Sequence, residues 1–151
     1  MKPPVVRGGA AADSAAPPQA VWDVLLDGRR WSFWNPGVEW MWLEGEAGPG
    51  TPVTIKLKGV RQTALVLTEL RPPRRFGLAL TIGPIARLEL TWTLAARVTG
   101  THIDAAVATS GFAGGLLLGR AAERIARALP RHVERLAAYA IEGNEKNARL
   151  E

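Results

Sequence analysis

Apolar residues recur at every second position along the middle of the chain, and this alternation limits the possible fold more than any other feature. It begins at Val38, is clearest over 53–58, and returns over 76–82, 88–94 and 103–107. A period of two is typical of strands with one buried and one solvated face. Turns rich in glycine or proline separate the segments, so we expect consecutive strands to pair antiparallel.

A long amphipathic helix is predicted after the strands, from about Phe112 to about Ile141. At about 100° per residue its apolar residues fall within one narrow stripe, and arginines and glutamates occupy the opposite face. Pro130 lies inside this segment and is expected to kink the helix or to split it in two. The members of the stripe are Leu118, Ala122, Ile125, Leu129, Leu136 and Ala140.

The predicted inward positions are almost entirely apolar, and a lining of this kind suits a ligand that is mostly hydrocarbon or aromatic. One more strand is predicted within 60–70, but its pattern does not fix which side faces inward. Apolar side chains can equally fill a solid core, and the tryptophans leave both interpretations open. The expected lining consists of Trp40, Trp42, Ile55, Leu57, Phe76, Leu78, Leu80, Leu90, Trp92, Ile103 and Val107 from the strands, with Ile125 and Leu129 from the helix.

Two short helices are predicted before the alternation begins. The prolines at 17–18 suit a helix start, and apolar residues over 21–26 recur at helical spacing. Trp31 and Trp34 lie three residues apart on one face of a second turn, which the sequence Asn-Pro-Gly at 35–37 ends. These tryptophans are expected to anchor the short helices to the rim of the sheet.

Length and composition exclude several kinds of site. The 151 residues suit one domain, predicted over 1–143, with a polar tail over 144–151. The absence of cysteine excludes disulfides, thiolate metal sites and a cysteine nucleophile. With two histidines far apart and no clustered carboxylates, we expect neither a metal nor a cofactor.

Location and partners are predicted from the same features. No segment approaches the run of about 18 apolar residues that a membrane span needs, and the N-terminus lacks the apolar region of a signal peptide. We therefore expect a cytoplasmic protein with no integral membrane segment. The net charge is +5, but the basic residues are spread along the chain, so no nucleic-acid partner is predicted. A monomer or a homodimer fits this description.

Several short motifs, taken in order, carry a family resemblance. They are Ala16-Pro17-Pro18 with Val21-Trp22 and Asp27, Trp31-x-x-Trp34-Asn35-Pro36, Gly50-Thr51, Thr68-Glu69, Pro72-Pro73, Trp92-Thr93-Leu94, Gly100-Thr101 and Ser110-Gly111. From about Ala16 to Gly143 the chain resembles the START-like, Bet v 1-like (SRPBCC) superfamily, in particular its bacterial polyketide cyclase/dehydrase and lipid-transport-like proteins.

The resemblance implies an α+β helix-grip fold. In this fold a curved antiparallel sheet of about seven strands wraps around a long C-terminal helix, with two short helices near the N-terminus. It also implies an internal cavity for a lipid, polyketide or similar ligand between sheet and helix. The sequence departs from the family where the first strand is expected, because a glycine- and alanine-rich stretch stands there. Whether this stretch forms the first strand is left open.

Three functions compete. The first is binding or transport of a small hydrophobic ligand. The second is an enzyme of the polyketide cyclase, aromatase or dehydratase type, in which His132 or Tyr139 assists proton transfer. These two lie seven apart on one side of the predicted helix and are the only catalytic candidates, since His102 and Asp104 face outward by parity. The third is an interaction module that presents a basic helix face or the basic turn over 71–75 to an acidic partner.

Overall fold

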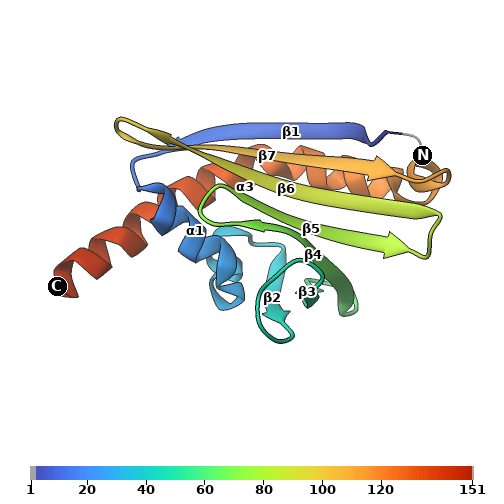
Figure 1. Cartoon of the computed structure of the whole chain (residues 1–151), viewed down its shortest axis with the longest axis horizontal. Helices are drawn as coiled ribbons and strands as arrows, with labels where there is room; N and C mark the ends of the chain where they lie inside the picture. The colour runs from blue at the N-terminus through green and yellow to red at the C-terminus, as the bar shows by residue number, and fades with distance from the viewer. Residues whose placement is uncertain (1–2, 151) are drawn as a thin grey trace.

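The computed structural model describes residues 3–150, and their side chains up to Gly143. Figure 1 shows a sheet whose long strands run beside one long helix, with the short helices between α3 and β2. The elements are β1 (Val5–Ser14), α1 (Pro18–Leu26), the 3-10 turn η1 (Gly28–Arg30), α2 (Trp31–Trp34), β2 (Val38–Leu43), β3 (Pro52–Leu57), β4 (Thr63–Arg71), β5 (Arg75–Ile82), β6 (Ala86–Arg97), β7 (Gly100–Ser110) and α3 (Gly114–Leu150).

All seven strands form a single antiparallel sheet in the order β1-β7-β6-β5-β4-β3-β2. Strands β2 to β7 are neighbours in sequence and in space, and β1 crosses to pair with β7 at the opposite edge from β2. Helix α3 packs against β1, β7 and β6, while α2 and η1 pack against β2. This is the predicted helix-grip architecture, and in residues 3–150 no helix is long and apolar enough to span a membrane.

The first strand forms despite its glycines and alanines. It pairs with β7 from Val5 opposite Thr109 to Ser14 opposite Thr101. Its small side chains have a packing role, because a Cβ added at Gly8 would collide with the Cβ of Ala126 on α3. The composition that weakens the local strand signal is therefore what lets the helix approach this edge closely.

The predicted inward direction of Trp40 and Trp42 is wrong. Both side chains are exposed, by 37% and 61%, whereas Met41 between them is buried. The cause is a β-bulge: the register with β3 shifts between Val38 and Trp40, so the side that faces inward changes after Val38. A single extra residue thus turns both tryptophans to the outside of the sheet.

Helix α3 buries the predicted stripe and is longer than predicted. It is assigned as one continuous helix through Pro130, so the expected split does not occur. Pro130 is exposed, and buried residues on both sides of it, including Leu129 and Val133, are packed into the core. The helix also continues past Ile141 to Leu150, through residues that are mostly good helix formers.

Candidate functional site

The inward faces of the strands form one continuous apolar surface, which we call the concave face. The register aligns its side chains in rows across the sheet: Leu78 pairs with Leu67 on one side and with Leu90 on the other. Leu90 pairs in turn with Val107. Residues far apart in sequence are thus brought together by the period-two pattern, as predicted.

Burial is graded along the concave face. The predicted residues Phe76, Leu78, Trp92, Ile103 and Val107, with Ile55 and Leu129, are buried. Four inward leucines stay half-buried although they pack against the core, and the half-buried Ile125 of α3 behaves in the same way. The four leucines are Leu57, Leu65, Leu80 and Leu90.

Strand β4 contributes lining residues that the sequence did not assign. Leu65 and the fully buried Leu67 face inward, and Leu70 pairs with the inward Phe76. The register shifts between Leu67 and Glu69, so the inward positions on either side of Thr68 have opposite parity. An alternation that reverses within a strand gives no consistent signal in the sequence.

Five rings form an aromatic cluster at the fully buried end of the concave face: Trp22, Trp31, Trp34, Phe76 and Trp92. The centroids of Trp31 and Trp34 lie 4.7 Å apart, and Trp31 meets Trp92 edge to face at 5.4 Å. Phe76 lies 5.7 Å from Trp92 and 6.1 Å from Trp22. The predicted anchoring role of the helix tryptophans is therefore confirmed, and Trp92 joins them.

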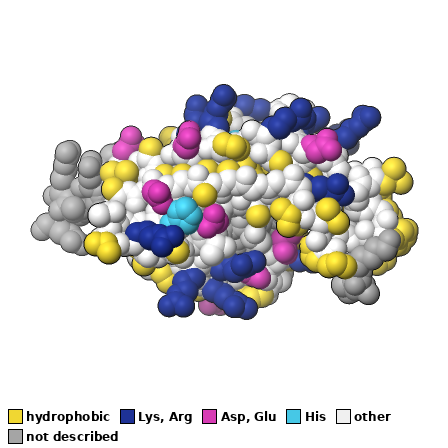
Figure 2. All heavy atoms as spheres, turned by 90° about the horizontal axis from the view of Figure 1, so that it is seen from above, with side chains coloured by type: hydrophobic (Ala, Val, Ile, Leu, Met, Phe, Trp, Pro, Cys, Tyr) yellow, Lys and Arg dark blue, Asp and Glu magenta, His cyan; other side chains and the backbone are white. Residues whose placement is uncertain are grey.

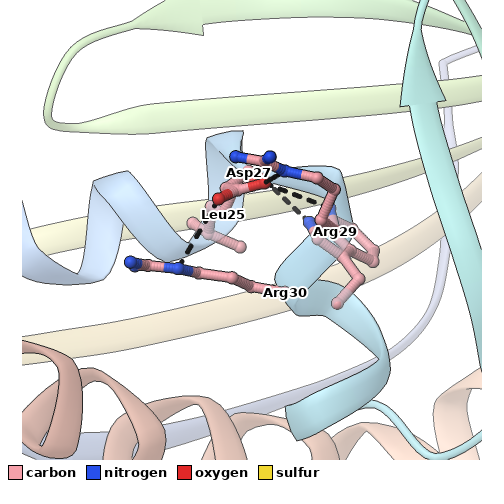
Figure 3. Close-up of polar contacts among 5 residues, drawn as sticks. Leu25, Asp27, Arg29 and Arg30 are labelled. Carbon is pink, nitrogen blue, oxygen red and sulfur yellow. Dashed lines mark hydrogen bonds and ion pairs between the residues drawn. The ribbon is translucent and has the colours of Figure 1, made fainter.

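The turn η1 places this cluster. The Asp27 carboxylate accepts the backbone N–H of Arg29 and forms ion pairs of 3.3 and 3.5 Å with Arg29 and Arg30 (Figure 3). The next residue, Trp31, donates its indole N–H to the carbonyl oxygen of Leu25 at 2.8 Å. That carbonyl belongs to the last turn of α1, where helix geometry provides no partner, so the indole caps α1.

Two other indoles of the cluster lack an acceptor. The Nε1 atoms of Trp34 and Trp92 are buried and have no hydrogen-bond partner among the described residues. A buried polar group left unpaired costs about 1–3 kcal/mol. A buried donor without a partner is unusual in a folded protein and calls for an explanation, such as a bound water, an ion or a functional role.

The two catalytic candidates are half-buried on α3 and are not paired with each other. Burial lowers the pKa of His132, and the positive charges of Arg135 and Arg131 lower it further. The ring of Tyr139 stacks on the exposed Phe33 of α2, with centroids 5.7 Å apart. No hydrogen bond joins His132 to a side chain of the described residues, so it has no orienting partner there.

His102 faces outward, as predicted, on β7. Its Nδ1 lies 2.7 Å from Asp13 Oδ1 and its Nε2 lies 3.3 Å from Asp104 Oδ2. Both carboxylates are largely exposed, so the arrangement belongs to the outer surface. Among residues 3–143, no group of three or more metal-ligating side chains is close enough to hold an ion.

The structure has two hollows at its surface. One, of about 350 Å³, lies on the outside of β2 and β3 and is lined by Trp40, Trp42, Glu44, Thr54 and Gln62. The other, of about 380 Å³, lies between the residues over 11–13 of β1 and those over 134–141 of α3. Apart from Trp40 and Trp42, which face outward, none of the residues predicted to line the ligand site lines either hollow.

The sheet, the gripped helix and the apolar concave face define a START-like, Bet v 1-like protein. A sequence profile of the family described as "Polyketide cyclase / dehydrase and lipid transport" matches residues 9–140, and the chain belongs to this family. No curated protein sequence matches it.

Solved structures share the fold at low identity. The protein TTHA0849 from Thermus thermophilus is 18% identical with a TM-score of 0.67, covering 93% of this chain and 98% of its own. Ara h 8.0201 is 14% identical with a TM-score of 0.65, covering 89% and 95%. The di-domain ARO/CYC protein BexL, from the BE-7585A biosynthetic pathway, is 18% identical with a TM-score of 0.64, covering 87% of this chain and 48% of its own.

Proposed function

We propose that this protein binds a small, mostly apolar molecule, such as a lipid, a polyketide or an aromatic compound, on the concave face beside α3. The observation that carries the proposal is the set of inward leucines that remain half-buried, above all Leu80 and Leu90. Apolar side chains that point into a fold gain stability from burial, so a partly exposed group of them is suited to an apolar ligand. The family description supports the same function.

The unpaired indoles add a requirement for the ligand. Trp92 stands two residues from Leu90 on the same face of β6, and its buried indole N–H has no acceptor among the described residues. A ligand oxygen that accepts a hydrogen bond from Trp92 would remove the cost of the unpaired donor. We infer that the ligand carries at least one carbonyl or hydroxyl oxygen on an otherwise apolar skeleton.

The test uses the neutral lipophilic probe N-phenyl-1-naphthylamine, whose fluorescence rises in apolar surroundings. Leu80→Gln and Leu90→Gln should each weaken probe binding about tenfold, since a lost leucine contact costs roughly 1–2 kcal/mol. Val98→Gln is the matched control, because Val98 is fully exposed in the β6–β7 turn. Thermal melts of all three variants monitor folding.

Equal affinity of Leu80→Gln, Leu90→Gln and the unchanged protein would contradict the proposal. An equal loss in Val98→Gln would show that the probe binds the surface. The hollow beside Trp42 offers the alternative site, and Trp42→Ser tests it with the same probe.

A cyclase or dehydratase is the second candidate, favoured by the half-buried His132. Its lowered pKa keeps the imidazole neutral at pH 7, the form that can accept a proton. Binding would hold a reactive chain in a cyclisable shape, and His132 would move the proton. The test is cyclisation of a β-keto thioester by the unchanged protein, His132→Gln and Tyr139→Phe. Turnover that both variants retain would exclude these residues as the acid or base.

We also propose a source and a location for the protein. The family resemblance favours a bacterial source, and the absence of cysteine fits the reducing conditions of the cytoplasm. Fractionation of the native host with an antibody against the chain tests this location.

A further inference from the structure

Large apolar side chains gather on the surface at one end of the molecule. Strand β1 begins there, opposite the end of β7, and the β5–β6 turn joins the same end because the Ile85 carbonyl accepts the N–H of Ala113. Figure 2 shows hydrophobic side chains at this end, which Figure 1 marks with the N-terminus. The apolar tip consists of Val5 (52% exposed), Val6 (70%), Ile82 (40%), Phe112 (80%), Leu116 (88%) and Leu117 (47%).

A row of arginines begins one turn beyond the apolar tip. The arginine stripe, defined as Arg120, Arg124, Arg127, Arg131 and Arg135, is exposed along its whole length. At about 100° per residue the five fall within an arc of about 80°, and at 1.5 Å per residue they span roughly 22 Å. Among residues 3–143 no carboxylate lies within ion-pair distance of any of them.

The tip and the stripe share one side of α3. Viewed along the axis of α3, Leu116 and Leu117 lie on either side of Arg120 and Arg124. This side of the helix is about 180° around the axis from the buried stripe. Three acidic residues, Glu123, Glu134 and Glu142, lie on or near this face within the part of the helix whose side chains are described, against five arginines, so positive charge dominates it. The lowered pKa of His132, to which Arg131 and Arg135 contribute, reports the same positive field.

We propose that the outer face of α3 docks this protein on an anionic lipid surface, with the apolar tip inserted among the acyl chains and the arginine stripe on the phosphate headgroups. Interfacial helices bind membranes in this manner, with apolar groups at the headgroup boundary and basic side chains on anionic lipids. Six large apolar side chains that are each at least 40% exposed at one end of the molecule are typical of an interaction surface, whereas ordinary exposed apolar residues are scattered singly.

Docking would also bring the concave face to the membrane. Ile82 of the apolar tip follows the half-buried Leu80 by two residues and continues its inward side of β5. An apolar ligand could thus pass from the bilayer to the concave face along one continuous apolar surface. This last step rests on the proposed function, whereas the docking itself does not.

Co-sedimentation with phosphatidylcholine vesicles, with and without phosphatidylserine, tests the docking on the full chain. We expect binding only to the vesicles that contain phosphatidylserine. Since each basic residue contributes roughly fivefold to such partitioning, R120Q/R124Q/R127Q should lose about a hundredfold. The charge-matched control R71Q/R74Q/R97Q removes three exposed arginines that lie outside α3, and its vesicle binding should fall little.

A second variant tests insertion of the tip. F112S/L116S changes two side chains that are at least 80% exposed, so folding should be kept, and vesicle binding should fall at least tenfold. The proposal would be overturned if R120Q/R124Q/R127Q and R71Q/R74Q/R97Q lost equal vesicle binding, or if F112S/L116S bound vesicles as well as the unchanged protein. Two other results would assign this face to a different partner and overturn the proposal. One is nucleic-acid binding that requires the arginine stripe but not the apolar tip, and the other is a dimer of the unchanged protein that F112S/L116S dissociates.

The naphthylamine probe separates this proposal from the proposed function. If F112S/L116S binds the probe normally but not the vesicles, docking and ligand binding are distinct properties. If the unchanged protein binds vesicles but never the probe, the proposed function fails and the docking stands.

Discussion

The sharpest test of the site's architecture compares two neighbouring tryptophans. Trp31 and Trp34 belong to the same short helix, are 2% and 0% exposed, and touch each other in the aromatic cluster. They differ in one respect: the Trp31 indole donates to the Leu25 carbonyl, whereas the Trp34 indole has no acceptor among the described residues. Replacing either tryptophan by phenylalanine therefore removes a similar side-chain volume. The two substitutions differ because only Trp31→Phe breaks a hydrogen bond.

The two substitutions should have clearly different costs. The smaller ring buries roughly 50 Å² less, which is about 1 kcal/mol in each variant. Trp31→Phe also leaves the Leu25 carbonyl unpaired at the end of α1, at about 1–3 kcal/mol, for a total of roughly 2–4 kcal/mol. Trp34→Phe removes an unpaired donor, and the relief offsets the lost packing, so its stability should stay within about 1 kcal/mol of the unchanged protein.

Urea unfolding followed by far-UV circular dichroism measures both values, and equal slopes would validate the comparison. The decisive quantity is the difference between the two free energies of unfolding, which should be at least about 1 kcal/mol with Trp31→Phe the less stable. A Trp34→Phe variant that is equally or more destabilised would refute the account of capping and of the unpaired donor.

Three further predictions concern single residues. The pKa of His132 in the folded protein lies below its ordinary value of about 6.5, so the unfolded chain binds more protons near this pH. The free energy of unfolding should therefore fall as the pH drops below about 6.5. In urea titrations at several pH values, His132→Gln should flatten this dependence. Gly28→Ala places a methyl group against the backbone carbonyl of Met41, and should lower the free energy of unfolding by about 1–3 kcal/mol in the same assay. Trp42→Ser should leave the melting temperature nearly unchanged because the side chain is 61% exposed; a loss comparable to that of a core tryptophan would contradict the bulge in β2.

Local periodicity was sufficient wherever a strand keeps one register throughout. The alternation correctly assigned the inward residues of β3, β5, β6 and β7, such as Ile55, Leu78, Trp92 and Ile103. The 3.6-residue period likewise identified the buried stripe of α3, because a helix face depends only on spacing along the chain. The helix-grip architecture could be predicted from these two periods together with the family motifs.

Tertiary contacts decided the remaining features. A bulge depends on how two strands pair, so the sequence could not reveal that Trp40 and Trp42 face outward or that β4 changes parity at Thr68. The strand β1 exists because β7 pairs with it and α3 needs small residues there, although its own propensity is weak.

The features with most functional meaning are those in which distant segments meet. The sequence alone determined an apolar interior and a basic helix face, because both are periodic properties of single elements. Only the fold decided that Val6, Ile82 and Leu116 share one exposed end, and that the indole of Trp31 finds a carbonyl while that of Trp92 finds none among the described residues. Such meetings depend on strand order and on the packing of the whole chain, which no local pattern encodes.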